Sequence, residues 1–136
     1  MRLENVIDWE TNKQGEVIVE MTYPGGILSV NRYKFRGKFT KPEVRQWMDE
    51  LAFIVRWVVG RLEVKFEPPI AIRVDGYFKD RRSMPDLHNL AKVCCDGVSE
   101  GLGIDDRHFA VSVGLPAVNP NKEPTIQITI GGTPDG

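Results

Sequence analysis

Residues 84–108 have the sequence MPDLHNLAKVCCDGVSEGLGIDDRH, which contains the clearest helical pattern of the chain. At 3.6 residues per turn, apolar and polar side chains separate onto opposite sides. The apolar side carries Leu87, Leu90, Cys94, Gly97 and Val98, with Ala91 and Val93 at its margins. The polar side carries His88, Asn89, Lys92 and Asp96, with Asp86 at its edge. The spacing predicts an amphipathic helix from about residue 87 to residue 100.

Patterns on both sides of this helix predict the remaining elements. Apolar residues alternate at 16–23, 70–77, 109–115 and 126–130, which predicts four strands. A second helical stripe runs from Val44 to Val59 behind Thr40-Lys41-Pro42-Glu43, a capping box. The link PAVNPNKEP at 116–124 is typical of a hairpin loop. The order predicts an α+β fold, a single domain with a mixed β-sheet and two main helices packed on it.

The composition is that of one globular domain. The chain has 136 residues, of which 41% are hydrophobic and 27% charged. We expect residues 1–15 to form an N-terminal extension of this domain and residues 131–136 a flexible tail. The adjacent Cys94 and Cys95 favour two buried thiols over a disulfide or a zinc site. With no apolar run of membrane-spanning length and no signal-like N-terminus, we expect a cytoplasmic protein without membrane partner or organic cofactor.

Positive charges are concentrated in two segments. The net charge of −1 argues against nucleic-acid binding over the whole surface. Residues 31–45 nevertheless interleave aromatic side chains with six cations. A shorter group of three cations, at 79–82, follows the strand predicted at 70–77. These cations are Arg32, Lys34, Arg36, Lys38, Lys41 and Arg45, then Lys79, Arg81 and Arg82. Two solvated loops would explain them, and so would local contacts to a polyanion.

The polar side of the helix at 87–100 also has two interpretations, a solvated face or a cation site. Solvated faces are usually rich in Glu, Lys and Gln, whereas this one has Asp, His and Asn. The turn at 101–103 could bring Asp105 and Asp106 back toward the start of the helix. Converging short carboxylates are typical of Mg²⁺ sites. These residue types favour the cation site.

The run Pro85-Asp86-Leu87-His88-Asn89-Leu90-Ala91-Lys92, followed by Asp96 and by Ile104-Asp105-Asp106, resembles the RusA-type Holliday-junction resolvases. Pro24 and Asn31-Arg32-Tyr33 fit the same family, and the likeness extends from about residue 23 to residue 130. It implies a homodimeric, Mg²⁺-dependent endodeoxyribonuclease that nicks two opposed strands of a four-way DNA junction. It also implies that Asp86, Lys92 and Asp106 are catalytic. Asn89, Asp96 and Asp105 match supporting positions.

His88 departs from the family pattern, which has an aspartate at this position. A neutral imidazole removes a negative charge and suits Mn²⁺ better than Mg²⁺. Three outcomes follow for the expected metal ligands Asp86, His88, Asp105 and Asp106. The protein works with Mn²⁺, it recruits another carboxylate such as Asp75, or it binds junctions without cutting them. An ion pair of Asp75 with Arg73 or Lys79 is the alternative explanation of that acidic residue.

We therefore expect a metal-dependent nuclease that resolves Holliday junctions or other branched DNA by phosphodiester hydrolysis, with the two basic segments contacting phosphates. One alternative is a catalytically weakened or inactive junction-binding dimer, caused by His88. Another is an unrelated small-molecule hydrolase or metal protein that shares the acidic helix. That alternative predicts no salt-sensitive binding to DNA.

Overall fold

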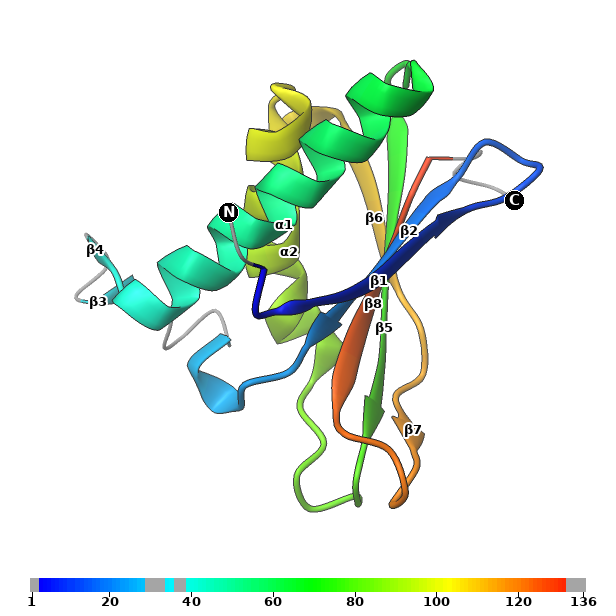
Figure 1. Ribbon diagram of the computed structural model, residues 1–136. Coiled ribbons are helices and arrows are strands. Elements are labelled where there is room, and N and C mark those ends of the chain that lie inside the picture. Colours follow the sequence, from blue (N-terminus) through cyan, green and yellow to red (C-terminus); the bar gives the residue numbers. More distant parts are fainter. Residues whose placement is uncertain (1–2, 29–33, 36–38, 132–136) are drawn as a thin grey trace.

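The computed structural model describes residues 3–28, 34–35 and 39–131. Two long helices, α1 (Pro42–Leu62) and α2 (Leu87–Leu102), lie together on one face of a sheet, as Figure 1 shows. No described helix combines the length and the apolar character that a membrane span requires. The predicted α+β fold, with a mixed sheet and two main helices, is confirmed.

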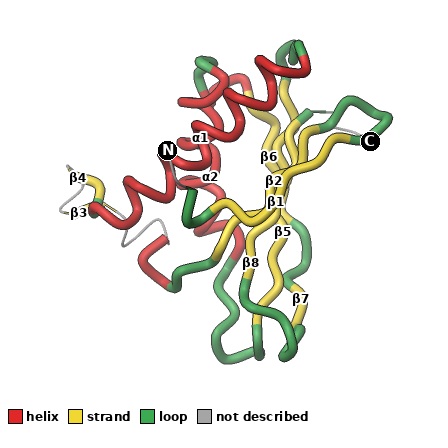
Figure 2. Tube along the Cα trace, viewed as in Figure 1, coloured by secondary structure: helices red, strands yellow, loops and turns green. Residues whose placement is uncertain are grey.

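The sheet has the strand order β1-β2-β8-β5-β6. Its strands are β1 (Val6–Thr11), β2 (Val17–Thr22), β8 (Thr125–Ile130), β5 (Ile70–Phe78) and β6 (Phe109–Val113), and a short β7 (Ala117–Val118) pairs with β5 beyond β6. Neighbours are antiparallel except at β5, whose pairings with β6 and β7 are parallel. The described chain also forms a two-stranded ribbon, β3 (Lys34–Phe35) with β4 (Phe39–Thr40), and two 3-10 turns, η1 (Gly26–Leu28) and η2 (Asp106–His108). Figure 2 shows helices, strands and loops in the same view.

The predicted hairpin at 116–124 is wrong. β6 follows β5 through the helical crossover α2 and therefore joins it in parallel at the far side from β8. The segment after β6 passes β5 through β7 before β8 enters the sheet between β2 and β5. Turn-forming residues mark the loop correctly, but they do not determine which strands become neighbours.

The expected N-terminal extension contains β1, a strand that the sequence patterns did not predict. Its side chains are only intermediate or exposed, because it is an edge strand with one neighbour. The strand is held where it begins by Glu50 of α1, a carboxylate that is only 2% exposed. Glu50 accepts hydrogen bonds from the backbone N–H of Asn5 (2.8 Å) and from its Nδ2 (2.7 Å). Tertiary contacts therefore place this strand, and local alternation contributes little.

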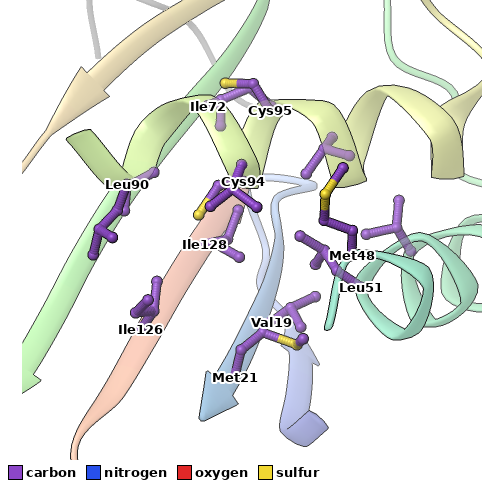
Figure 3. Close-up of a cluster of buried hydrophobic side chains, with 14 of the residues drawn as sticks. Val19, Met21, Met48, Leu51, Ile72, Leu90, Cys94, Cys95, Ile126 and Ile128 are labelled. Carbon is purple, nitrogen blue, oxygen red and sulfur yellow. The ribbon is translucent and has the colours of Figure 1, made fainter. Parts of the chain in front are cut away.

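The core lies between the sheet and the two helices. Alternate residues of β2, β5 and β8 point to the helices, and Figure 3 shows their side chains meeting Leu51 of α1 and Leu90 and Cys94 of α2. The helices approach closely at two glycines of α2. A Cβ atom on Gly97 would lie 2.7 Å from Leu51 Cδ2, and one on Gly101 would lie 2.8 Å from the Ala52 carbonyl oxygen. This approach fixes the position of α2 over the sheet.

The start of α1 differs from the predicted capping box. The N-cap is Lys41, which makes no capping hydrogen bond with its side chain, and the helix begins at Pro42. Proline is favoured in the first helical turn because its ring presets φ and no N–H is lost there. Pro42 therefore places the helix start one residue later than the Thr40 cap would have done.

Candidate active site

Asp86 is the N-cap of α2. Its Oδ1 accepts a hydrogen bond from the backbone N–H of His88 (2.9 Å), which satisfies one of the free donors at the helix start. The side chains of Asp86 and His88 are exposed at this end of the helix. The same residue that the resemblance assigns to catalysis therefore also starts the helix.

The far end of α2 turns the chain back along the helix. Gly103 has φ 70°, a left-handed conformation, and donates its N–H to the Ser99 carbonyl oxygen (2.9 Å). The Ser99 hydroxyl donates to the Ile104 carbonyl oxygen (2.7 Å). The chain then enters η2, where Asp105 Oδ1 accepts the N–H of Arg107 (2.9 Å), and this bond lowers the pKa of Asp105.

Lys92 joins this returning segment to α2. Its Nζ lies 3.2 Å from Asp96 Oδ1, one turn further along the helix, and 3.4 Å from Asp106 Oδ2 on η2. The hydrogen bond to Asp96, aided by Asp106 and opposed by partial desolvation, raises the pKa of Lys92. Asp106 therefore lies beside Lys92 and Asp96 of α2.

Cys95 lies beneath this cluster, on the buried side of α2. Burial raises the pKa of its thiol to about 11, and the negative charges of Asp106 and Asp96 act in the same direction. Cys94 is fully buried, and burial raises the pKa of its thiol as well. Both cysteines are free, as the sequence predicted, and neither presents a thiolate near neutral pH.

The described residues do not form a ready metal site. In residues 3–28, 34–35 and 39–131, no group of three or more His, Cys, Asp and Glu side chains converges as a metal would require. Asp86 and Asp105 each use a carboxylate oxygen as a cap, and Asp96 and Asp106 meet on the ammonium of Lys92. A single chain thus offers paired carboxylates around a cation, and this arrangement does not fit a divalent ion without rearrangement.

Asp75 is not a nearby substitute ligand. It alternates with Val74 on β5, whose buried side chain faces the helices, so Asp75 points to the opposite face of the sheet. There its Oδ2 lies 3.0 Å from Nε of Arg73. The absence of a side chain on Gly114 gives it room, since a Cβ atom there would lie 1.9 Å from Asp75 Oδ1. The ion pair with Arg73, offered above as the alternative, is the arrangement observed.

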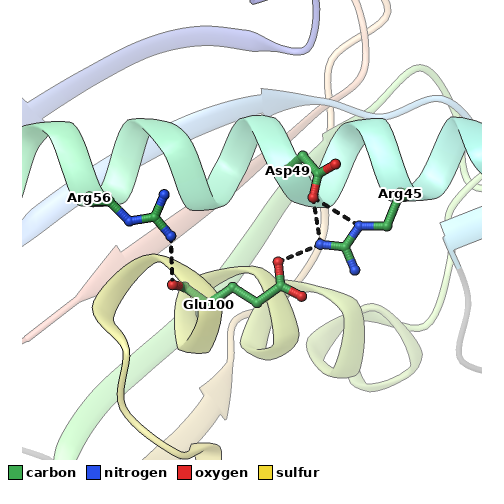
Figure 4. A network of polar contacts seen from close by, with 4 residues as sticks. All are labelled: Arg45, Asp49, Arg56 and Glu100. Atoms are coloured by element: carbon green, nitrogen blue, oxygen red, sulfur yellow. Dashed lines mark hydrogen bonds and ion pairs between the residues drawn. The ribbon is translucent and has the colours of Figure 1, made fainter.

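Arg45, expected to contact DNA, joins the two helices. Its guanidinium binds Asp49 Oδ1 through Nε (2.8 Å) and Nη2 (2.5 Å), and Nη2 also contacts Glu100 of α2. Arg56 donates from Nη2 to the Glu100 carbonyl oxygen (3.0 Å), as Figure 4 shows. The hydrogen bonds to Asp49 and Glu100 raise the pKa of Arg45. Sequence patterns missed this role because Glu100 comes from a different helix.

Lys79, Arg81 and Arg82, which were also expected to contact DNA, are exposed. Lys79 lies 3.6 Å from Glu123 in an exposed ion pair. Arg81 and Arg82 are exposed in the loop before α2, which Asp80 shapes by accepting the Ser83 N–H (2.8 Å). Arg32, Arg36 and Lys38 lie outside the described residues, and only the backbone of Lys34 is described.

Comparisons with known proteins identify a family for the chain and a solved structure with a similar fold. The family model described as endodeoxyribonuclease RusA matches residues 28–131, whereas no curated protein sequence matches the chain. Among solved structures, the periplasmic domain of Helicobacter pylori MotB is similar, with a TM-score of 0.51 and 12% identity over 96% of this chain and 82% of that one. At this identity the likeness concerns the fold alone. The family model, in contrast, spans most of the sequence and all of α2 and η2, so the chain belongs to the RusA endodeoxyribonuclease family.

Proposed function

We propose that the chain is a divalent-metal-dependent endodeoxyribonuclease that resolves Holliday junctions or related branched DNA, acting as a homodimer. Family membership supports the nuclease activity. The contact between Lys92 and Asp106 is the observation that supports placing this activity at the Lys92 cluster. The two residues are 14 positions apart in the sequence, both belong to the pattern that resembles the resolvases, and their side chains lie 3.4 Å apart.

Lys92 is the proposed electrostatic catalyst. Its ion pairs are partly exposed, and exposed pairs of this kind are worth only about 0.2–1 kcal/mol, so the ammonium can exchange a carboxylate for a phosphate oxygen at little cost. Asp96 and Asp106 keep it protonated by raising its pKa. A fixed cation at this position stabilises the negative charge that develops on the scissile phosphate or on the departing oxygen.

The proposed metal dependence rests on the family, whose members in general depend on a divalent metal. The proposed ligands are Asp86, His88, Asp105 and Asp106, with Mg²⁺ as the expected ion and Mn²⁺ favoured by the imidazole. A bound ion would polarise the phosphate and lower the pKa of an attacking water. We assign no individual step to it, because one chain does not present these side chains as a formed site.

Lys41, Lys79, Arg81 and Arg82 are the described cations proposed to contact DNA phosphates, together with Arg32, Lys34, Arg36 and Lys38. Arg45 already binds Asp49 and Glu100, and these carboxylates would compete with a phosphate for its guanidinium. Phosphate contacts position DNA without reading its sequence, so binding should weaken with salt and vary little with sequence.

The second candidate is a dimer that binds junctions without cutting them. The observation in its favour is that no group of three potential metal ligands converges within the described residues. It predicts tight, structure-specific binding and no product with any metal. In that case His88→Asp, which restores the family carboxylate, should recover cleavage.

The deciding experiment is cleavage of a synthetic four-way junction and a matched linear duplex with Mg²⁺, with Mn²⁺ and with chelator. Asp86→Asn is the key variant, because asparagine also caps helices and the fold is therefore retained while the charge is lost. Asp80→Asn is the matched control, because Asp80 is an exposed aspartate of the preceding loop that also accepts a backbone N–H, from Ser83. Paired nicks that Asp86→Asn abolishes and Asp80→Asn preserves support the proposal. Equal cleavage by both variants would refute the assigned site.

A further inference from the structure

A hollow of about 330 Å³ opens beside η2, at the end of the sheet where β5 and β6 begin. It is lined by Pro68, Pro69, Arg107, His108 and Phe109, and we call it the η2 hollow. Its volume lies at the lower end of the range for ligand pockets, roughly 300–1,000 Å³. Three of these five residues are apolar, and the other two carry a guanidinium and an imidazole. The η2 hollow therefore combines an apolar wall with groups that can donate hydrogen bonds to an anion.

Arg107 is the cation of the η2 hollow, and its side chain is exposed. Its Nε donates to Nε2 of His108 (3.4 Å), and this contact uses neither Nη atom. No ion pair joins Arg107 to another residue of the described ranges. Arg45 and Arg73, in contrast, are each paired with a carboxylate. A guanidinium whose terminal nitrogens are not engaged can bind a phosphate through two parallel hydrogen bonds.

The charges of η2 limit what the hollow can hold. Asp105 and Asp106 directly precede Arg107 and His108, so this turn has no net positive charge. Asp105 is also close enough to both groups for their charges to help lower its pKa. A free anion would therefore gain little here, and it would leave the apolar wall uncovered. A nucleotide fits both parts, because its phosphate can reach Arg107 while the face of its base covers the prolines and Phe109.

We propose that the η2 hollow is a nucleotide subsite, in which Arg107 binds a DNA phosphate next to the scissile one and the three apolar residues receive the adjoining base. The inference rests on the proposed function, because it takes the Lys92 cluster as the place of cleavage. Arg107 directly follows Asp106, whose carboxylate lies 3.4 Å from Lys92 Nζ. Consecutive Cα atoms are about 3.8 Å apart, and successive phosphates of a strand advance by about 3.4 Å along a duplex. One DNA strand can therefore reach both cations.

The local geometry of η2 separates the two cations. In a 3-10 turn of about three residues, successive side chains point in directions roughly 120° apart. Asp106 contacts Lys92, whereas Arg107 and His108 line the hollow. Arg107 is therefore a positioning residue, which holds the strand beside the reacting phosphate. We expect it to affect the affinity for DNA and to leave the maximal rate of cleavage unchanged.

The subsite also predicts a preference for branched DNA. A base that enters the η2 hollow has left the stack of its own duplex. Unstacking costs least where pairing and stacking are already interrupted. A branch point interrupts stacking, and a linear duplex does not. The contribution of Arg107 to binding should therefore be larger for a junction than for a duplex.

Binding of a synthetic four-way junction and a matched duplex in the presence of chelator tests the subsite without cleavage. Arg107→Gln removes one charge and should weaken junction binding by roughly tenfold, and duplex binding much less. Arg61→Gln is the matched control, because Arg61 is also exposed, lies over Trp57 at the end of α1 and has no ion pair to a described residue. It should leave both affinities unchanged. Equal responses of the two variants, or equal losses for junction and duplex, would overturn the proposal.

A scan with one neutral phosphate locates the contact. A methylphosphonate is placed in turn at each position around the branch. At one position the wild type should lose as much affinity as Arg107→Gln does, and the variant should lose nothing further, because its partner group is already gone. An abasic nucleotide beside that position should weaken wild-type binding as well. The absence of such a position, or an abasic nucleotide without effect, would overturn the nucleotide subsite.

Cleavage with Mg²⁺ and with Mn²⁺ is scored separately. At saturating junction Arg107→Gln should cut at the wild-type rate, while the junction concentration that gives half of this rate rises about tenfold. A contacted phosphate more than two nucleotides from the cut would overturn the location of the subsite and leave the nuclease activity standing. A contacted phosphate in a protein that cuts nothing would refute the nuclease proposal and leave the nucleotide contact standing.

Discussion

Two clusters of ion pairs in this protein have the same arrangement of charges, but their contacts differ in strength. In each, a helical cation meets an acid one turn further along its own helix and a second acid from another element. Arg45 meets Asp49 and Glu100, and Lys92 meets Asp96 and Asp106. The first joins α1 to α2, and the second joins α2 to η2. We propose that the same charge pattern serves structure at Arg45 and chemistry at Lys92.

The difference follows from the cations. The Arg45 guanidinium engages Asp49 through two nitrogens, at 2.8 and 2.5 Å, and reaches Glu100 as well. Lys92 is a single ammonium at 3.2 and 3.4 Å from its partners. A planar guanidinium that binds carboxylates through several nitrogens loses more stabilising energy when those partners are removed. A flexible ammonium changes partners readily. We therefore expect the Arg45 cluster to affect stability and the Lys92 cluster to affect activity.

Lys92→Ala should give the largest effect, a fall in junction cleavage of roughly 10²-fold or more, because a fixed charge at the phosphate is lost. The free energy of unfolding should change by no more than about 0.5 kcal/mol, since the side chain is on the surface. Single-turnover cleavage and urea denaturation measure the two effects. A large loss of stability with unchanged cleavage would reverse the roles assigned to the two clusters.

Gly101→Ala should have the next largest effect, because it would push apart the helices that the Arg45 cluster joins. The added Cβ would lie 2.8 Å from the Ala52 carbonyl oxygen, a backbone atom that cannot move aside. We expect a loss of about 1–3 kcal/mol in unfolding free energy. Gly60→Ala on α1 is the control, since a Cβ atom added there would meet nothing within 4 Å, and it should gain about 0.5–1 kcal/mol. Equal thermal midpoints for the two variants would exclude the close approach.

Arg45→Ala should lower the unfolding free energy by about 0.5–1 kcal/mol, the upper range for partly exposed pairs. A double-mutant cycle with Glu100→Ala measures the coupling across the helices. The equivalent cycle for Lys92 and Asp106 should give a smaller coupling energy. If Arg45→Ala weakens junction binding more than Lys41→Ala does, then Arg45 also contacts phosphate.

The smallest expected effect is a difference in alkaline behaviour. The folded pKa of Lys92 is raised, so its ion pairs contribute stability below the ordinary lysine pKa of about 10.4 and lose it as pH rises through the folded value. The pKa of Arg45 is raised from an already higher value, so its pairs persist. Unfolding curves over the alkaline range should show the difference between wild type and Lys92→Met shrinking with pH. The difference between wild type and Arg45→Met should not shrink.

The sequence alone determined the features that depend on local spacing. The period of apolar residues predicted α2 and its two faces, because a helix places every third or fourth side chain on one side wherever it packs. Alternation predicted β2, β5, β6 and β8, and the Asp86–Lys92 pattern indicated the family that the comparisons confirm.

Only the tertiary structure decided the features that join distant segments. β1 depends on the Glu50 contacts, and the neighbours of β6 depend on the path of the chain around β5. The turn after α2 determines that Asp106 meets Lys92, and the packing of α1 on α2 determines that Arg45 meets Glu100. Periodicity along a chain fixes which way a side chain faces, but the partner it meets is set by where the whole fold places the other segment.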